Sequence, residues 1–261
     1  MLRQVLFAIL VVLLGLVVVA KARSILLPAG GAAPEAAPAD RSLPAHVTGG
    51  PLDLPAGLVP QLDSFTRAGV RVRLSAEPDR QYLDSLFTET DSVVRHWPGG
   101  GNAILYAIVP GGPEGFRPEM VPEVRWALDS WNPASIGLRF TEAADTSGTT
   151  FVVRWADTLD AERAGVTDVT WDKAGRIRHA VVYLATRSPS TGRPFTVDAR
   201  RAIVLHEIGH ALGLPHSGRP GDVMFPVASA TELSDRDRFS LRLLYEFPTG
   251  WIGTVRAEPP P

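Results

Sequence analysis

The stretch HEIGHALGLPH, residues 206–216, constrains this chain more than any other part, because it holds three of the six histidines. On a helix, His206 and His210 lie one turn apart on the same face, close enough to bind one ion. Gly213 can adopt the positive φ that ends a helix sharply, and the proline that follows blocks any continuation. The turn brings His216 back under the other two. Three neutral imidazoles and one vacant position are typical of catalytic zinc.

Glu207 follows the first of these histidines and can project beside such an ion rather than onto it. A carboxylate in that place can take a proton from bound water. A lone H-E-x-x-H pattern also occurs by chance, and three unrelated histidines satisfied by hydrogen bonds are the competing interpretation. The continuation to Gly213 and His216 favours a metal site. Because the chain has no cysteine, any metal must be held by nitrogen or oxygen.

The run H-E-x-x-H-x-x-G-x-x-H resembles the metzincin metalloproteases, whose signature includes a later methionine turn. Met224 in DVMFP matches that turn. The flanking residues are similar to the matrixin family within the metzincins. They are Ser217 directly after the third histidine, Pro226 two residues after the methionine, and the later runs LSDRD and LRLLY. The resemblance covers roughly residues 96–247.

The resemblance implies an α+β fold of the zincin type, with a twisted mixed five-stranded sheet, three main helices and a small C-terminal subdomain after the zinc-binding helix. It implies that Met224 forms an apolar floor beneath the zinc rather than a ligand. Phe225 and Pro226 would begin the segment that lines the pocket for the substrate side chain after the scissile bond. The edge strand AGVTDVTW, residues 164–171, would pair with an extended substrate peptide.

Two features depart from the matrixin pattern. Many matrixins block the open zinc position with a propeptide thiolate, which is impossible here; Asp53, Glu89 and Asp91 are carboxylates that could take that place. Between the third and fourth strands, mammalian matrixins carry a long insertion that holds a structural zinc and calcium. Here that interval is DTLDAERAGVTD, residues 157–168, which is short and has no histidine. We therefore expect one catalytic zinc and no structural zinc, and leave calcium open. We expect His96, His179 and His46 not to be ligands.

The N-terminus carries an apolar run from Val5 to Ala20 after Arg3. A helix of that length rises about 24 Å, less than a hydrocarbon core of about 30 Å, and Ala-Lys-Ala resembles a cleavage site. Residues 1–22 are therefore interpreted as a signal peptide, or as an uncleaved anchor to the membrane because of the positive charge just beyond the run. Both interpretations place the rest of the chain outside the cytoplasm.

The remaining chain divides by composition and periodicity. Residues 23–60, rich in Ala, Pro and Gly, predict a linker. Residues 61–95 predict a pro-region or an N-terminal extension, with an alternating strand at 70–74 and a helix at 79–94. Residues 96–250 predict the catalytic domain, and 251–261 a tail. Within the domain, periodicity and turn signals predict strands in 103–110, 137–142 and 149–156, a hairpin over 164–186, and helices over 117–132, 197–212 and 233–247.

Capping signals refine the last two helices. Thr196 suits the N-cap of the motif helix. Ser234 and Asp237 are spaced as a capping box. In matrixins an aspartate at the second of these positions can instead pair with the N-terminus exposed by activation, and both roles are kept open.

These features together predict a zinc endopeptidase that cleaves proteins or peptides outside the cytoplasm. Zinc held by His206, His210 and His216 would activate a water, and Glu207 would act as its general base. The alternative is a noncatalytic, zinc-stabilised peptide-binding module of the cell envelope; a third interpretation is an accidental motif without zinc. The net charge of −2, with both signs interspersed, argues against nucleic acid as a partner.

Overall fold

The computed structural model describes residues 61–101, 103–160 and 163–253, which all fall within one unit of the chain, residues 42–261. The interpretations of residues 1–60 as signal, anchor and linker lie outside the described residues. Within the described ranges, no helix is both long enough and apolar enough to cross a membrane.

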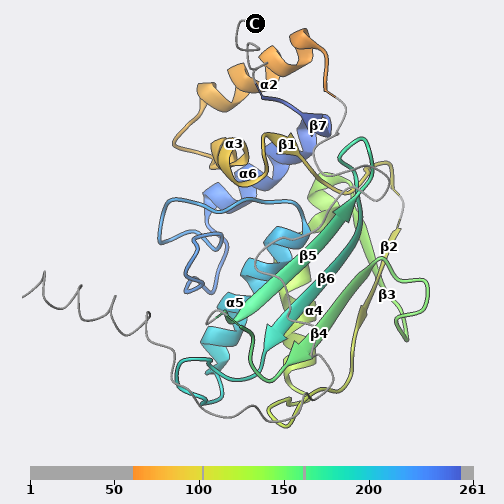
Figure 1. Ribbon diagram of the computed structural model, residues 1–261, viewed down its shortest axis with the longest axis vertical. Coiled ribbons are helices and arrows are strands. Elements are labelled where there is room, and N and C mark those ends of the chain that lie inside the picture. Colours follow the sequence, from red (N-terminus) through yellow and green to blue (C-terminus); the bar gives the residue numbers. More distant parts are fainter. Residues whose placement is uncertain (1–60, 102, 161–162, 254–261) are drawn as a thin grey trace, which may run out of the picture. The chain divides into compact units, whose positions relative to one another are not determined.

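A twisted mixed sheet of five strands forms the centre of the fold (Figure 1). The strands are β2 (Ala103–Ile108), β3 (Arg139–Glu142), β4 (Phe151–Ala156), β5 (Gly165–Trp171) and β6 (Ile177–Ala185). Their order is β3-β2-β4-β6-β5; the first four run parallel, and β5 pairs antiparallel with β6 at the edge. All five lie within the segments predicted as strands, and the α+β fold is confirmed.

Two helices, α4 (Met120–Trp131) and α5 (Val197–Ala211), pack against each other on one face of the sheet (Figure 1). Helix α4 buries one apolar stripe, whereas every residue of α5 from Ala202 onward is buried. A helix covered on all sides can hold polar side chains only where they have partners. The polar residues in the second half of α5 therefore need a structural or functional explanation.

The N-terminus of α5 is capped as predicted, because the Thr196 hydroxyl accepts a hydrogen bond from the backbone N–H of Ala199. Helix α6 (Asp235–Glu246) begins with the predicted capping box of Ser234 and Asp237. After α6 the chain reaches β7 (Gly250–Trp251), which pairs antiparallel with β1 (Val93–Val94). The C-terminal subdomain is thereby joined to the segment that precedes the main sheet.

The strand predicted at residues 70–74 is wrong, because α2 (Ser64–Ala76) covers it. The sequence VRVRL alternates, but Val70 and Leu74 are buried at helical spacing whereas Val72 is 69% exposed. The missed signal is Asp63, whose side chain accepts a hydrogen bond from Thr66 N at 2.9 Å and caps the helix.

The helix predicted over 79–94 is reduced to a 3-10 turn, η1 (Leu83–Ser85), and a single α-helical turn, α3 (Leu86–Glu89). Asp91 and Ser92 then adopt φ values of +52° and +64°, which end the helix and turn the chain into β1. Three of the four apolar residues that suggested the helix, Tyr82, Leu83 and Leu86, are buried, so their spacing correctly indicated the core-facing side.

Candidate metal centre

His206 and His210 project from one face of α5 and are both buried. The Nδ1 atom of His206 lies 2.8 Å from the carbonyl oxygen of Val223, and that of His210 lies 2.9 Å from the carbonyl oxygen of Leu214. Because a carbonyl oxygen can only accept, Nδ1 of each ring carries the proton. The two Nε2 atoms, 3.1 Å apart, are then left as electron-pair donors.

Gly213 ends α5 with a φ of +99°, and a Cβ at this position would overlap the carbonyl oxygen of Arg95. The chain reverses there, and Leu214 N donates to Gly209 O at 3.1 Å. The reversal brings the His216 ring to 5.3 Å and 4.7 Å, between centroids, from the rings of His206 and His210. The local signals read from the sequence thus correspond to the turn that gathers the three rings.

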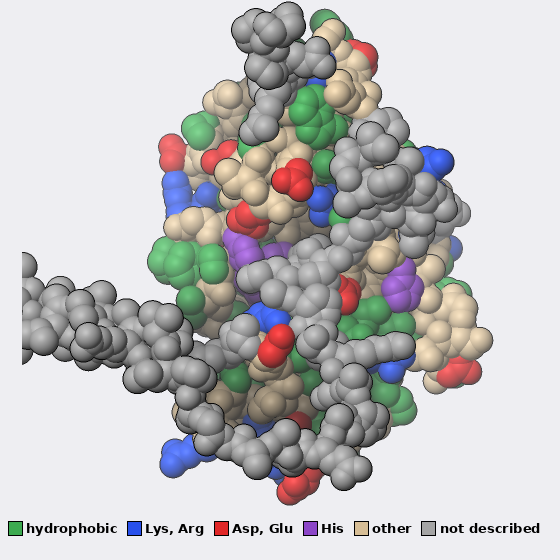
Figure 2. Space-filling model, viewed as in Figure 1, with side chains coloured by type: hydrophobic (Ala, Val, Ile, Leu, Met, Phe, Trp, Pro, Cys, Tyr) green, Lys and Arg blue, Asp and Glu red, His purple; other side chains and the backbone are tan. Residues whose placement is uncertain are grey.

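The three histidines offer nitrogen atoms within 4.8 Å of one another, and among the described residues they form the one such group of three or more. Neutral imidazoles with their outer nitrogens bonded to oxygen acceptors suit a divalent transition metal, above all zinc. Figure 2 shows histidine side chains gathered at one place on the surface, with acidic side chains beside them. The donor set fits the metal expected from the sequence.

Glu207 lies on the same helix with only 6% of its surface exposed. Its Oε2 accepts a hydrogen bond of 2.6 Å from the hydroxyl of Thr167 on β5. Burial raises the pKa of Glu207 to about 7, although Thr167 and the neighbouring His216 act in the opposite direction. A cation held by the histidines would lower this pKa, because an opposite charge favours the ionised form.

Met224 is fully buried beneath the histidines' helix. A Cβ on Gly209 would overlap the Met224 Sδ and a ring carbon of Trp131, so only glycine lets the methionine approach α5 this closely. Ser217 N donates to Met224 O at 2.7 Å, which closes the loop between them. The structure therefore explains the glycine inside the motif as a packing requirement.

A cleft of about 740 Å³ runs past the three histidines and Glu207. One wall is the start of β5, the edge strand of the sheet, and the other includes Pro226 and the two residues after it. Phe225, which was also expected in the substrate pocket, is half-buried and is not among the residues that line the cleft.

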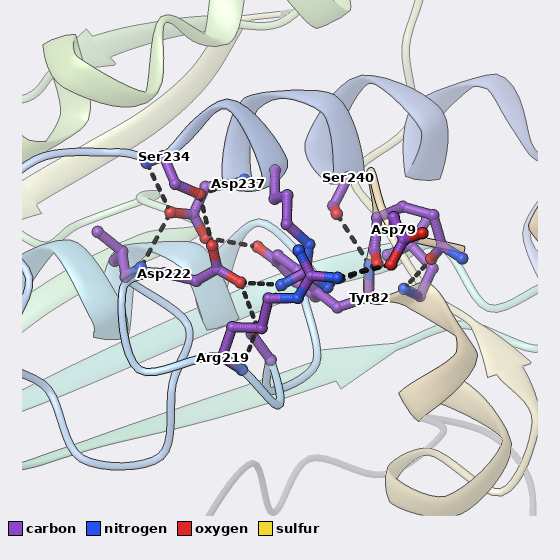
Figure 3. A network of polar contacts seen from close by, with 12 residues as sticks. Asp79, Tyr82, Arg219, Asp222, Ser234, Asp237 and Ser240 are labelled. Carbon is purple, nitrogen blue, oxygen red and sulfur yellow. Dashed lines mark hydrogen bonds and ion pairs between the residues drawn. The ribbon is translucent and has the colours of Figure 1, made fainter. Parts of the chain in front are cut away.

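The loop between His216 and α6 is held by a network of polar contacts (Figure 3). Asp237 Oδ2 accepts hydrogen bonds of 2.9 Å from Val223 N and Ser234 N, and its Oδ1 accepts one of 3.0 Å from the Tyr82 hydroxyl. The capping role of Asp237 is thus confirmed. It also fixes Val223, whose carbonyl oxygen orients His206.

Asp222, which sequence reasoning missed, stands next to that network. Its carboxylate contacts Arg236 and Ser217 and accepts a hydrogen bond of 2.7 Å from the Ser234 hydroxyl. Earlier in the same loop, Arg219 forms an ion pair of 2.7 Å with Asp79. An aspartate two residues before Met224 was the one local hint, but its partners Ser234 and Arg236 belong to the start of the next helix.

Two further residues acquire a place at the site that the sequence did not predict. Thr167 was read only as part of a strand, yet it holds Glu207. Glu89 was considered as a blocking group, yet its Oε2 accepts from His216 N at 2.9 Å and lies 3.1 Å from His216 Nδ1. Neither contact has a sequence signal, because each joins segments at least forty residues apart.

The other described histidines stand apart from the centre. His96 is buried, with Nδ1 2.8 Å from Trp97 O and Nε2 2.9 Å from Phe247 O. His179 is half-buried on β6, where desolvation, together with the charge of Arg154, lowers its pKa. His46 lies outside the described residues.

Comparison with known proteins found a matching family and matching individual proteins. The sequence model of the matrixin family matches residues 96–246. Matrix metallopeptidase-21 of Danio rerio is 39% identical over 71 residues, which are 26% of this chain and 11% of that protein. The chain thus matches only about a tenth of the length of this relative.

Proposed function

The chain belongs to the matrixin family of zinc-dependent metalloproteases, and we propose that it is a zinc endopeptidase acting on proteins outside the cytoplasm. The observation that carries the proposal is the convergence of three imidazoles beside a buried glutamate in a cleft. The cleft is bordered by an edge strand, which suits a substrate that binds as an extended peptide.

We propose that His206, His210 and His216 hold one zinc ion, which supplies a Lewis acid that polarises the scissile carbonyl and makes water acidic. The backbone carbonyls of Val223 and Leu214 fix the tautomers of the first two rings, so that both present Nε2 to the ion. Fixed tautomers reduce the reorganisation needed for binding.

Glu207 is the proposed general base. Its carboxylate takes a proton from the attacking water as the new C–O bond forms. It then passes a proton to the departing nitrogen as the C–N bond breaks, which returns Glu207 to its ionised form. Thr167 lies on β5, the strand that would also bind the substrate. It supports this role because its hydroxyl donates a hydrogen bond to Glu207 Oε2.

Substrate binding would use β5 and the wall opposite. Among the described residues β5 is the edge strand, and an extended peptide would add to the sheet next to it. Pro226 and its successors, across the cleft, would contact the side chain that follows the scissile bond. Met224 would serve as the apolar floor.

The proposal is tested with the full chain carrying Glu207→Ala, compared with Glu114→Ala, which removes a carboxylate that is 94% exposed. The parent should retain one zinc per chain and cleave members of a peptide library. Glu207→Ala should retain zinc but lose about 10²–10⁴-fold in kcat, because a general base is removed. Glu114→Ala should match the parent.

Two other outcomes decide between functions. A parent that retains zinc and cleaves nothing across the library would favour the noncatalytic peptide-binding module. A parent that retains no zinc would refute both. The retention of a glutamate held in place by Thr167 supports catalysis, because a binding module does not need that base.

The proposed location rests on the sequence of residues 1–22. Fractionation followed by N-terminal sequencing tests it. A start near Arg23 in the exported fraction would indicate a cleaved signal, and an intact Met1 in the membrane fraction would indicate an anchor. A cytoplasmic protein would contradict both.

A further inference from the structure

The third histidine of the metal centre is contacted by a residue from outside the region that the matrixin model matches. Glu89 is the last residue of α3, seven residues before the start of that region at residue 96. Its Oε2 accepts a hydrogen bond of 2.9 Å from His216 N and lies 3.1 Å from His216 Nδ1. One carboxylate oxygen therefore faces both the backbone and the ring of the same residue.

The position of Glu89 determines which ring nitrogen of His216 carries the proton. A carboxylate beside Nδ1 stabilises a proton there, which leaves Nε2 with its electron pair. His206 and His210 show the same pattern, but their outer nitrogens face backbone carbonyl oxygens. His216 lies in a loop and receives a charged acceptor instead.

We infer that Glu89 is a positioning residue of the metal centre, which holds His216 in the orientation and tautomer that zinc requires. The inference rests on the proposed function, because it presumes that the three histidines bind zinc. It differs from the role considered from sequence, in which Glu89 blocks the open position. The blocking role requires the carboxylate to reach the ion, whereas Oε2 faces the outer nitrogen of His216.

The surroundings of Glu89 hold it in place. Leu86, one turn earlier, is fully buried, and the Thr90 hydroxyl donates to Leu86 O at 2.9 Å. The left-handed residues Asp91 and Ser92 then lead into β1, which is paired with β7. Helix α3 also packs against η1 and β1, the elements on either side of it in sequence.

A second set of contacts ties the same segment to α6, whose Asp237 also holds the loop after His216 by accepting a hydrogen bond from Val223 N. The Tyr82 hydroxyl donates to Asp237, and Tyr82 N donates to the Ser240 hydroxyl at 3.2 Å (Figure 3). Arg236 also donates to the carbonyl oxygen of Gln81 at 2.8 Å. Within the described residues, the segment around Gln81, Tyr82 and Glu89 is therefore part of the support of the metal centre.

The test compares full-length Glu89→Ala and Glu89→Gln with Glu77→Ala. Glu77 is the matched control, because it lies in the same N-terminal segment, is similarly exposed and pairs with Arg80 instead of a histidine. For each protein, zinc affinity is measured by competition with a chelator. The unfolding temperature is measured without zinc, and kcat and KM are measured with saturating zinc.

Glu89→Ala should weaken zinc binding by about 10–100-fold, the usual effect of removing a partner that orients a metal ligand. Glu89→Gln should recover much of that loss, since its amide oxygen still accepts both hydrogen bonds but carries no charge. Glu77→Ala should bind zinc like the parent. The unfolding temperatures of the zinc-free proteins should differ little.

Three results would overturn the inference. In the first, Glu89→Ala binds zinc as tightly as Glu77→Ala. In the second, Glu89→Ala is more active than the parent at equal zinc content, which would indicate a blocking group. In the third, Ala and Gln variants lose zinc equally and both lower the zinc-free unfolding temperature, which would indicate a general structural role. Failure of the proposed function is distinguishable, because the parent itself would then bind no zinc or cleave nothing.

Discussion

The metal-binding segment, residues 196–226, and the N-terminal segment, residues 61–95, line the same cleft but are specified in different ways. The first follows local rules, because its cap, its helix and its glycine turn each depend on residues close in sequence. The second is placed by distant partners, such as His216 for Glu89 and Asp237 for Tyr82. The difference teaches that metal-binding residues can be predicted from the sequence immediately around them, whereas the residues that orient their side chains cannot.

The largest expected effect is in the metal-binding segment. His210→Ala removes one of three proposed ligands, and a two-histidine remnant should not retain zinc through gel filtration or cleave peptides. Elemental analysis and a peptide assay measure both. His179→Ala is the matched control, because His179 lies on β6 away from the cluster and should be dispensable. Equal zinc content in the two variants would contradict the assignment.

The next effect tests whether the N-terminal segment belongs to the folded domain. Leu86→Ala removes a fully buried side chain and should lower the free energy of unfolding by about 2–5 kcal/mol. Phe65→Ala, at a position 87% exposed in the same segment, should change it by less than about 0.5 kcal/mol. Urea denaturation at a fixed zinc concentration measures both. Equal effects would mean that the segment packs weakly and behaves as a detachable pro-region.

The comparison also explains which sequence predictions succeeded. The five strands, the capped helices α5 and α6 and the turn at Gly213 were predictable, because periodicity and capping act within a few residues. The motif likewise predicted which three histidines come together. Resemblance to a family supplied the expectation of a single mixed sheet of five strands, which no local pattern contains; the strand order came only from the structure.

What could not be predicted depends on contacts between segments far apart. The alternation of VRVRL suggested a strand because period 2 and period 3.6 both place residues 70 and 74 on one face. Within the run itself, only the exposure of Val72 distinguishes the two patterns, and exposure is a property of the folded chain; the one sequence signal for the helix was the N-cap Asp63, seven residues before Val70. The contacts of Thr167 with Glu207 and of Glu89 with His216 are of the same kind.

A smaller effect tests the link between the two segments directly. Tyr82→Phe removes the hydroxyl that donates to Asp237 but keeps the buried ring. Loss of a hydrogen bond to a charged acceptor should lower the free energy of unfolding by about 1.5–3 kcal/mol. Tyr183→Phe is the control, since among the described residues its hydroxyl has no hydrogen-bond partner. A cost no larger than that of Tyr183→Phe would show that this link contributes little.

The smallest expected effect concerns Val72 and decides between the helix and the strand predicted from the sequence. Val72 is 69% exposed on α2, so Val72→Ala loses little burial and gains helix propensity, which should raise the free energy of unfolding by up to about 0.5 kcal/mol. In a strand the same change should be destabilising, because Val favours strands and Ala does not. Val70→Ala is the matched control, because it is the same substitution in the same helix at a position that is 4% exposed. The loss of two buried methyl groups there should lower the free energy of unfolding by about 2 kcal/mol. Urea denaturation of the two variants gives opposite signs if α2 forms as described, and a loss of stability in both would contradict the helix.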